Sequence, residues 1–355
     1  MRHPDKAPHS ASPPIPADEA RYTAAVIPTT MLAVLAQVAD EYGVAVDPWL
    51  SGLGLTRAQI DDAGVRVSYR QASIIIRRAR AAIPRARLGL DVGCHQSLGT
   101  FGVLGLAMIT SRTFGEAMAV GIENHQVSGS MMDLELEPLD RGDVALLATP
   151  RFADDELLVF LCEELFSSSL IVCRGLLGPS FSPKRLELTY SAPAYAADYR
   201  RLFNCEIRFG ARHNRAVVDP RWLAMPLPTH HPVSAQQALA LCQEQLAGIK
   251  RQSEVVASVE RILRGRLRDH PTLEQVAQSL HLSGRTLRRH LAATGHAYRD
   301  IHDSVRAKRA LELLRAGALS IADIGVEIGF SDAREFRRAF KRWTGAPPRA
   351  MRTAH

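Results

Sequence analysis

Apolar residues recur at helical spacing over the first part of the chain, in short segments separated by Pro, Gly and Asp. The first segment begins near Thr29 or Thr30 and runs toward Tyr42. Three more lie at 56–62, 69–83 and 112–125. Because side chains three and four residues apart share one helix face, each segment is predicted to be a short amphipathic helix.

The period then changes to alternation. Residues 131–137 and 144–146 alternate apolar and polar side chains on either side of a turn that contains Pro138 and Gly142. This pattern is typical of two strands joined by a turn. Further strands are expected at 185–190, 205–209 and 215–218, and helices at 154–177 and 194–202. Helices with a few antiparallel strands make this part of the chain α+β.

The longest apolar stretch, Leu157–Leu177, is interrupted by Glu163, Glu164 and Arg174. A carboxylate pair at the centre of a membrane span is costly. We therefore expect a buried helix here and no membrane segment in the chain. The first 20 residues carry Pro, Ser and His without an apolar core, so we expect a disordered leader and not a signal peptide.

A Pro-rich segment at 223–233 is predicted to be a linker. After it, Ser234 and Gln237 have the spacing of a helix-capping box. The helix that they would open has an apolar side that includes Ala238 and Cys242. This side is expected to pack either on the preceding domain or on a partner chain.

Two segments near the C-terminus repeat one another. Thr272–Leu291 and Ser320–Phe340 align at an offset of 48 residues, which becomes 49 after one inserted residue in the second copy. Each copy has a capping residue, an apolar helix face, a short turn and a second capped helix. This order predicts two helix-turn-helix motifs, at Leu273 to Leu291 and at Ile321 to Phe340.

The repeat also predicts which residues start and pack these helices. The first helices are expected to be capped by Thr272 and Ser320, and the second by Ser283 and by Ser331 or Asp332. The small residues Ala277 and Gly325 stand where the two helices of each motif must approach closely.

The basic charge of the chain is concentrated in this region. Residues 251–355 hold 20 Lys and Arg against 11 Asp and Glu, whereas residues 1–250 hold 24 against 26. The second helix of each motif is apolar on one face and basic on the other. Its basic residues are Arg285, Arg288 and Arg289 in the first copy, and Arg334, Arg337, Arg338, Lys341 and Arg342 in the second. Such a helix suits the DNA major groove, where a guanidinium reaches guanine O6 and N7 or a phosphate.

One helix is predicted between the two motifs, at 298–315. A helix of this length spans about 27 Å. Successive major grooves on one face of DNA are about 34 Å apart. Two recognition helices held at this separation would therefore enter both grooves, so that one chain reads two half-sites.

Over about residues 251–352, the chain resembles the AraC/XylS family of transcription regulators. The resemblance rests on Leu282-Ser283-x-Arg285-Thr286-Leu287-Arg288-Arg289-x-Leu291, Ile321-Ala322-Asp323-Ile324, Gly329-Phe330-Ser331-Asp332 and Phe336-x-Arg338-Ala339-Phe340-Lys341-Arg342-Trp343-Thr344-Gly345-x-Pro347. Carried over residue by residue, it implies base contacts by Arg285, Arg289, Ala333, Arg334 and Arg338. The neighbouring Arg288 and Arg337 are expected to contact phosphate, and Lys341 to add to DNA affinity.

The sequence departs from this family at three positions. Gly325 stands where the family usually has Ala, at a cost of about 1 kcal/mol in helix propensity. Glu335 and Arg337 replace residues that are commonly small. Glu335 would accept from cytosine N4, pair with a neighbouring Arg, or cap the helix together with Asp332, and the last two roles are favoured.

The region before the linker resembles the arabinose-binding-type sensor domain of one subgroup of this family, which includes regulators of ornithine and related amino-acid metabolism. The matching stretches are Leu98-Gly99-Thr100-Phe101-Gly102-x-Leu104-Gly105, Phe203-Asn204-Cys205-x-Ile207-x-Phe209-Gly210-Ala211, Asn214 and 218–227. The resemblance implies an effector-sensing domain but identifies neither the effector nor its binding residues. The expected domains are a leader at 1–20, an α+β effector-sensing and dimerisation domain at 21–225, a linker and connecting helix at 226–250, and an all-α DNA-binding domain at 251–355.

Other candidate residues give no catalytic or metal site, and no cofactor is expected. His230-His231 lacks metal-ligand partners at useful spacing. His125, near the first hairpin, is a candidate for a pocket wall, but a surface or hydrogen-bonded core position is favoured. Ser167-Ser168-Ser169 lies in a helical pattern and is no nucleophile elbow. Met131-Met132 is expected in the core. The five cysteines lie far apart without a C-x-x-C pair, which fits buried thiols in a reducing cytoplasm.

These patterns favour a cytoplasmic, sequence-specific DNA-binding regulator, associated with the nucleoid when bound. Its expected partners are double-stranded DNA, a small-molecule effector, RNA polymerase and a second copy of the chain. One alternative is a ligand-independent regulator whose N-terminal domain serves only dimerisation or protein contacts. Another is an enzyme fused to the same DNA-binding module, which is disfavoured because it needs a reactive cysteine and no cysteine has a second one nearby.

Overall fold

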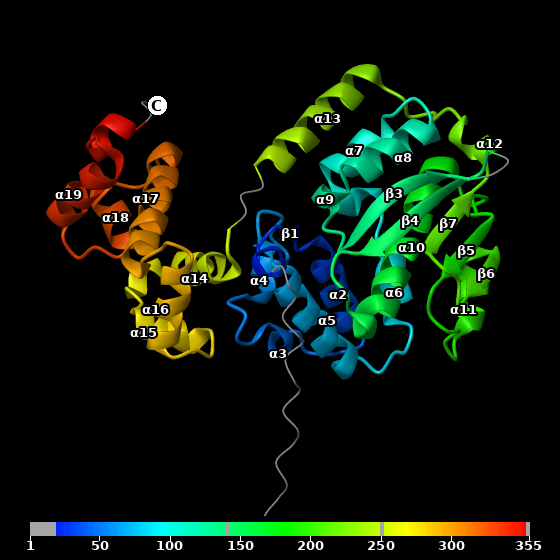
Figure 1. Ribbon diagram of the computed structural model, residues 1–355. Helices are drawn as coiled ribbons and strands as arrows, with labels where there is room; N and C mark the ends of the chain where they lie inside the picture. Colours follow the sequence, from blue (N-terminus) through cyan, green and yellow to red (C-terminus); the bar gives the residue numbers. More distant parts are fainter. Residues whose placement is uncertain (1–18, 140–141, 249–251, 353–355) are drawn as a thin grey trace, which may run out of the picture.

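The structure is a computed structural model that describes residues 19–139, 142–248 and 252–352. Its buried apolar side chains form two separate cores, one between Tyr22 and Cys242 and the other between Val256 and Phe340. The chain therefore has an α+β N-terminal body and a smaller, wholly helical C-terminal body, as the sequence predicted (Figure 1). None of the described helices is long and apolar enough to cross a lipid bilayer.

Short helices and one small ribbon make up the first half of the N-terminal body. The elements are α1 (Glu19–Tyr22), β1 (Ile27–Pro28), α2 (Thr30–Glu41), α3 (Asp47–Leu50), α4 (Arg57–Ile60), β2 (Arg66–Val67), α5 (Tyr69–Ala82), α6 (Leu88–Cys94), the 3₁₀ turn η1 (Leu98–Phe101), α7 (Val103–Ile109), α8 (Phe114–Glu123) and α9 (His125–Ser128). The predicted leader overlaps α1 at Glu19 and Ala20, because Tyr22 anchors this turn on the rings of Tyr69 and Phe152. The rest of the leader lies outside the described residues.

A five-stranded sheet follows, in the order β3-β4-β7-β5-β6. Its strands are β3 (Met132–Pro138), β4 (Val144–Pro150), β5 (Arg185–Leu188), β6 (Glu206–Phe209) and β7 (Asn214–Val218). All pairs are antiparallel except β5 and β6, which run parallel. The sequence predicted antiparallel strands only. The difference arises because α11 (Ala196–Phe203) crosses between β5 and β6, and a crossover helix returns the chain in the same direction.

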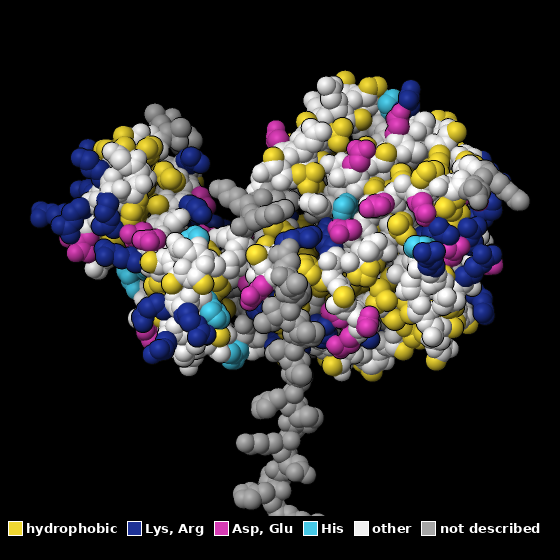
Figure 2. Space-filling model, viewed as in Figure 1, with side chains coloured by type: hydrophobic (Ala, Val, Ile, Leu, Met, Phe, Trp, Pro, Cys, Tyr) yellow, Lys and Arg dark blue, Asp and Glu magenta, His cyan; other side chains and the backbone are white. Residues whose placement is uncertain are grey.

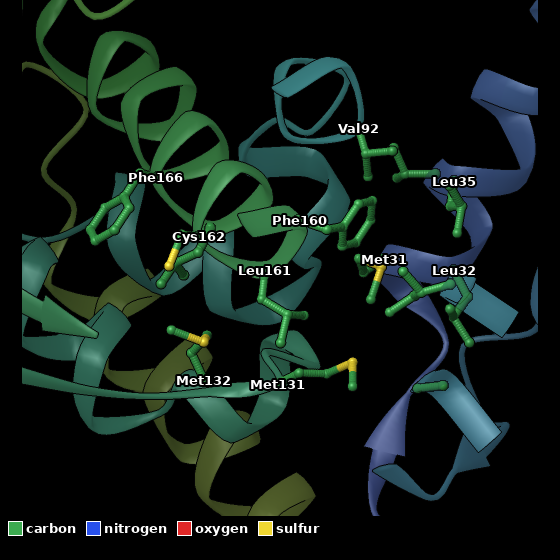
Figure 3. Packing of buried hydrophobic residues seen from close by; sticks show 14 of the residues in the cluster. Met31, Leu32, Leu35, Val92, Met131, Met132, Phe160, Leu161, Cys162 and Phe166 are labelled. Carbon is green, nitrogen blue, oxygen red and sulfur yellow. The ribbon is translucent and has the colours of Figure 1, made fainter. Parts of the chain in front are cut away.

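The long helix α10 (Asp155–Leu177) is the centre of the N-terminal core and packs closely against α6. Two glycines permit this approach, since a Cβ on Gly89 would lie 2.7 Å from Phe160 O and one on Gly93 would lie 2.5 Å from Glu164 O. Figure 3 shows Phe160 of α10 among buried side chains of α2 and α6. Met131 and Met132 are buried in the same core, as predicted.

The connection to the C-terminal body passes through α12 (Pro220–Leu223) and α13 (Pro232–Ala247). The predicted capping box at Ser234 is wrong, because α13 begins at Pro232 and is capped by His231, whose Nδ1 accepts from Ser234 N at 3.2 Å. Proline suits the first helical position, where no N–H is needed. The apolar side of α13, with Ala238 and Cys242 buried, packs on α7 of the same chain.

The C-terminal body consists of helices and two 3₁₀ turns. The elements are α14 (Glu254–Gly265), η3 (Leu267–Asp269), α15 (Leu273–Ser279), α16 (Gly284–Ala293), α17 (Tyr298–Ala316), α18 (Ile321–Glu327), α19 (Ala333–Thr344) and η4 (Pro348–Met351). The predicted helix at 298–315 is confirmed as α17. It contacts α18 and α19 of the second motif directly, and it contacts α14, which packs against α15 and α16 of the first motif.

Candidate nucleic-acid interface

The first helix of each repeat starts at its predicted cap. Thr272 Oγ1 accepts from Gln275 N at 3.2 Å, and Gln275 Oε1 accepts from Thr272 N at 2.8 Å. Ser320 and Asp323 make the same reciprocal pair, at 3.1 and 3.3 Å. Each box satisfies two backbone N–H groups that the helix leaves free, so α15 and α18 begin in the same way.

The second helices are capped as well. Ser283 Oγ accepts from Thr286 N at 3.1 Å at the start of α16. Asp332, and not Ser331, caps α19, where its Oδ1 accepts from Arg334 N at 2.8 Å. These bonds fix the first turn of both helices, which is the part that meets base edges in a helix-turn-helix protein.

Close packing holds the two helices of each motif together. Ala277 is fully buried, and a Cβ on Gly325 would lie 3.3 Å from the Cβ of Phe336. The predicted close approach is therefore confirmed at Gly325, and the burial of Ala277 is consistent with it. The turns between the helices need a left-handed residue, which is His281 at φ +53° in the first motif and Gly329 at φ +85° in the second.

The basic side chains of α16 and α19 point away from the core. Leu287, Leu291, Phe336 and Phe340 are buried on the opposite faces of these helices. The exposed basic residues are Arg285, Arg288, Arg289, Arg334, Arg337, Arg338, Lys341 and Arg342, and Ala333 is half-buried. Figure 2 shows Lys and Arg side chains gathered on the C-terminal body, over the region of α16 and α19 in Figure 1.

Few acidic groups neutralise this surface. Arg342 Nη2 lies 3.0 Å from Asp303 Oδ2, and Arg288 lies 3.8 Å from the exposed Glu274. Glu335 is exposed on α19 and, among the described residues, has neither an ion pair nor a capping bond. The two favoured roles for Glu335 therefore receive no support from these contacts, and its carboxylate stands free among arginines.

The separation of the two motifs is set by α17. Its 19 residues span about 28 Å at a rise of about 1.5 Å per residue. Both motifs also share one hydrophobic core, which includes Leu287 of α16, Ile301 and Leu314 of α17, and Phe336 of α19. The two recognition helices therefore belong to one packed body.

A buried cation lies at the junction of the repeats. Arg306 of α17 is 8% exposed, stacks over the Phe330 ring at 4.8 Å and contacts His270 through its guanidinium. Burial, reinforced by the charge of Arg306, lowers the pKa of His302 to about 4 and also lowers that of His270. At this junction, His270 and His302 are therefore favoured in their neutral forms beside the positive charge of Arg306.

The C-terminal body is docked on the N-terminal body through α14. The Glu254 carboxylate accepts from Arg70 Nε at 2.6 Å and from the Ser68 hydroxyl. Arg261 donates through Nε to Gly54 O and through Nη1 to Arg66 O, both at 3.1 Å. Burial lowers the pKa of Arg261 to about 10. We call these contacts the α14 seam.

A second contact reaches the first helix-turn-helix motif itself. His281, in the turn between α15 and α16, lies with its Nε2 2.9 Å from Ser51 Oγ. A Cβ on Gly52 would lie 2.4 Å from the His281 ring. The sequence alone does not predict these contacts, because Ser51 and His281 are 230 positions apart and leave no local pattern.

The remaining candidate residues are placed as follows. His230 Nδ1 lies 3.0 Å from Thr110 O, and among the described residues no group of three or more His, Cys, Asp or Glu side chains is arranged to hold a metal. The Ser167–Ser169 run lies within α10, as predicted. All five cysteines are free, and three of them are buried. His125 lines a pocket, which is the alternative that the sequence left open; its Nδ1 lies 2.7 Å from Ile122 O, and its buried Nε2 has no hydrogen-bond partner.

These features define a DNA-binding regulator. Its helical C-terminal body at 252–352, which carries both helix-turn-helix motifs and is called the reader below, packs on a larger sensor-like body. The chain matches the family described as "Arabinose-binding domain of AraC transcription regulator, N-term" at residues 43–227, and a helix-turn-helix domain at residues 276–354. The chain therefore belongs to the AraC family of transcription regulators. The matched family models and the curated relatives are those of transcription regulators and not of enzymes.

Curated relatives cover most of the chain. The ornithine utilization regulator of Pseudomonas aeruginosa is 30% identical over 333 residues, which is 94% of this chain and 98% of that protein. The transcriptional regulator VqsM of the same organism is 25% identical over 276 residues, or 72% of this chain and 81% of that protein. The crystal structure of the regulator CdpR from Pseudomonas aeruginosa aligns over 92% of this chain and 98% of its own, with a TM-score of 0.48 and 22% identity.

Proposed function

We propose that α16 and α19 read base edges in successive major grooves on one face of DNA. Arg285 and Arg289 would contact bases from α16, and Ala333, Arg334 and Arg338 from α19. The observation that carries this proposal is the exposure of these arginines on two capped helices that α17 holds in one body. Free guanidinium groups are the side chains best suited to guanine O6 and N7.

The flanking basic residues have a different role in this proposal. Arg288, Arg337 and Lys341 would contact phosphates, which position the reader without selecting a sequence. Their contribution should fall as salt rises, because each phosphate contact releases a bound counterion. The proposed DNA-binding domain spans 251–355, after a connecting helix at 226–250 and a sensor domain at 21–225.

Genomic footprinting with the intact protein would first identify the bound sites. On such a site, Arg289→Ala and Arg338→Ala should each weaken binding by about 1–3 kcal/mol and relax the preference at the contacted base pair. Arg264→Ala is the matched control, because Arg264 is exposed on α14 and lies outside both recognition helices. Unchanged affinity and an unchanged footprint for both variants would contradict the groove assignment.

We further propose that a small-molecule effector bound in the N-terminal body biases DNA binding. A pocket in that body and the α14 seam support this proposal over a ligand-independent role confined to dimerisation or protein contacts. The pocket is lined by Met31 of α2, α2 packs on α5, and the first turn of α5 holds Glu254. A shift of α2 on ligand binding would therefore move α5 and change its contacts with Glu254 in the α14 seam.

The contact between Gly52 and His281, beside the α14 seam, can be tested without changing any proposed DNA contact. Gly52→Ala places a methyl group against His281 in a left-handed conformation, so it should loosen the docked reader and change DNA affinity. Gly43→Ala is the control, because Gly43 also has a positive φ but no atom lies within 4 Å of its added Cβ. Equal DNA affinities for the two variants, measured by fluorescence anisotropy, would count against coupling through this contact.

The remaining partners are also proposals. A regulator of this kind would act in the cytoplasm, on the nucleoid, and would contact RNA polymerase when it activates. A second copy of the chain is a further proposed partner, and Val233 and Leu241 on α13 are exposed apolar side chains to test in a dimer assay.

A further inference from the structure

A pocket of about 90 Å³ lies in the N-terminal body, between α10 and the helices α7, α8 and α9. Its wall is largely apolar and contains the methionines Met31, Met108 and Met118, whose flexible thioethers adapt to different shapes. One water needs about 10–15 Å³ of such volume. The pocket therefore has room for about six to nine water-sized groups, the size of a small organic ligand.

One carboxylate faces this pocket. Glu164 of α10 lines the pocket and keeps part of its surface accessible. Burial raises the pKa of its carboxyl to about 7. Gln96 Nε2 donates to its Oε1 at 2.5 Å. Among the described residues, no Lys or Arg pairs with this group and no donor reaches its Oε2.

The neighbouring carboxylate shows what a satisfied buried acid looks like in this fold. Glu163 accepts from the hydroxyls of Tyr195 and Tyr199, at 2.8 and 2.6 Å, and does not line the pocket. The two acids are adjacent in α10 and point into different surroundings. Glu163 is hydrogen-bonded by two tyrosines, whereas Glu164 lines the pocket and its Oε2 has no hydrogen-bond partner among the described residues.

A second polar side chain, that of His125, lines the same pocket. The Nδ1–H of His125 donates to Ile122 O at 2.7 Å, which leaves Nε2 as an acceptor in the neutral ring. This Nε2 is buried without a hydrogen bond, and the nearest acid, Asp133, lies 3.8 Å away. A buried polar atom without a partner is unfavourable.

We propose that this pocket binds a small aliphatic ammonium compound, whose charged nitrogen pairs with Glu164 and whose hydrocarbon part lies among the apolar wall residues. This inference rests on the effector-responsive function proposed above and names the chemical class of its effector. An ammonium group supplies the cation and the donors that Glu164 lacks. A ligand carboxylate in its place would meet Glu164 without any lysine or arginine in the pocket wall.

Three probes with the same six-carbon chain test which head group the pocket prefers. They are n-hexylamine, 1-hexanol and hexanoate. Isothermal titration of the full chain near pH 8 should give saturable 1:1 binding of hexylammonium, with 1-hexanol and hexanoate at least tenfold weaker. Hexanol or hexanoate binding as tightly as the amine would overturn the assignment, and so would the absence of saturable amine binding.

Substitutions then locate the site. Glu164→Gln keeps the size and the bond to Gln96 but removes the charge, and should weaken hexylammonium binding at least tenfold. Glu123→Gln is the matched control, because Glu123 is exposed on α8 outside the pocket, and it should leave the dissociation constant unchanged. An unaltered dissociation constant for a folded Glu164→Gln variant, verified by circular dichroism, would refute the proposal.

The outcome is distinguishable from failure of the proposed function. DNA binding by the ligand-free protein tests the reader alone. If the amine binds but DNA affinity does not change, the ligand site is supported and the effector response is refuted. If the protein binds DNA but no amine, the DNA-binding function is supported and the proposed ligand class is refuted.

Discussion

The buried histidines beside Arg306 predict that acid destabilises the DNA-binding body. Burial and the charge of Arg306 lower the pKa of His302 from about 6.5 to about 4 in the folded state. Above pH 6.5 the ring is neutral in both states and has no effect. As the pH falls from 6.5 toward 4, the unfolded chain takes up a proton that the folded chain refuses, so the free energy of unfolding falls.

The size of this loss follows from the shift. One unit of pKa corresponds to about 1.4 kcal/mol, so the full difference would be about 3 kcal/mol below pH 4. At pH 5 the same linkage gives about 2 kcal/mol relative to pH 8, and partial exposure of the His302 ring reduces this to about 1–2 kcal/mol. His270, whose pKa is also lowered, adds to the slope.

The assay needs a probe confined to the C-terminal body. Trp343 is its one tryptophan, so emission in a Trp49→Phe, Trp222→Phe background reports the unfolding of this body in urea. Its free energy of unfolding should decline between pH 6.5 and 4.5. His302→Gln should flatten that decline, since glutamine does not titrate. A slope that is the same with and without His302 would refute the reasoning.

Two further predictions concern the reader. Glu335→Gln should change the base preference at one position of the α19 half-site, measured by selection from randomised DNA, because the free carboxylate is placed to accept from cytosine N4; an identical selected sequence would show that Glu335 reads no base. Residues 251–355 alone should fold and bind the same site, because their core closes without the N-terminal body; a fragment that is folded but inert on DNA would show that the α14 seam is needed for binding.

The sequence predicted the structure best where the structure follows from neighbouring residues. The caps at Thr272, Ser283 and Ser320 and the continuous helix over 298–315 were all predicted. Capping and helical periodicity involve residues three or four apart, so one sequence displays them directly. The duplication made the prediction stronger, because the same pattern occurs twice at nearly one offset.

Local patterns also gave wrong predictions when a tertiary contact competed with them. Ser234 and Gln237 have the spacing of a capping box, but α13 starts at Pro232, where His231 N donates to Thr110 O at 3.1 Å and holds the chain against the N-terminal body. The parallel pairing of β5 and β6 likewise depends on the path of the connection and not on either strand's own residues.

The sequence by itself determined that this protein carries two helix-turn-helix motifs with basic outer faces, and that it resembles the AraC family. Only the tertiary structure decided where the reader docks and which polar groups lack partners. Glu163 and Glu164 are adjacent residues of the same type. Glu163 is hydrogen-bonded by two tyrosines, whereas Glu164 lines a pocket. Such differences arise from contacts between distant residues, and a single sequence records the residues but not the contacts.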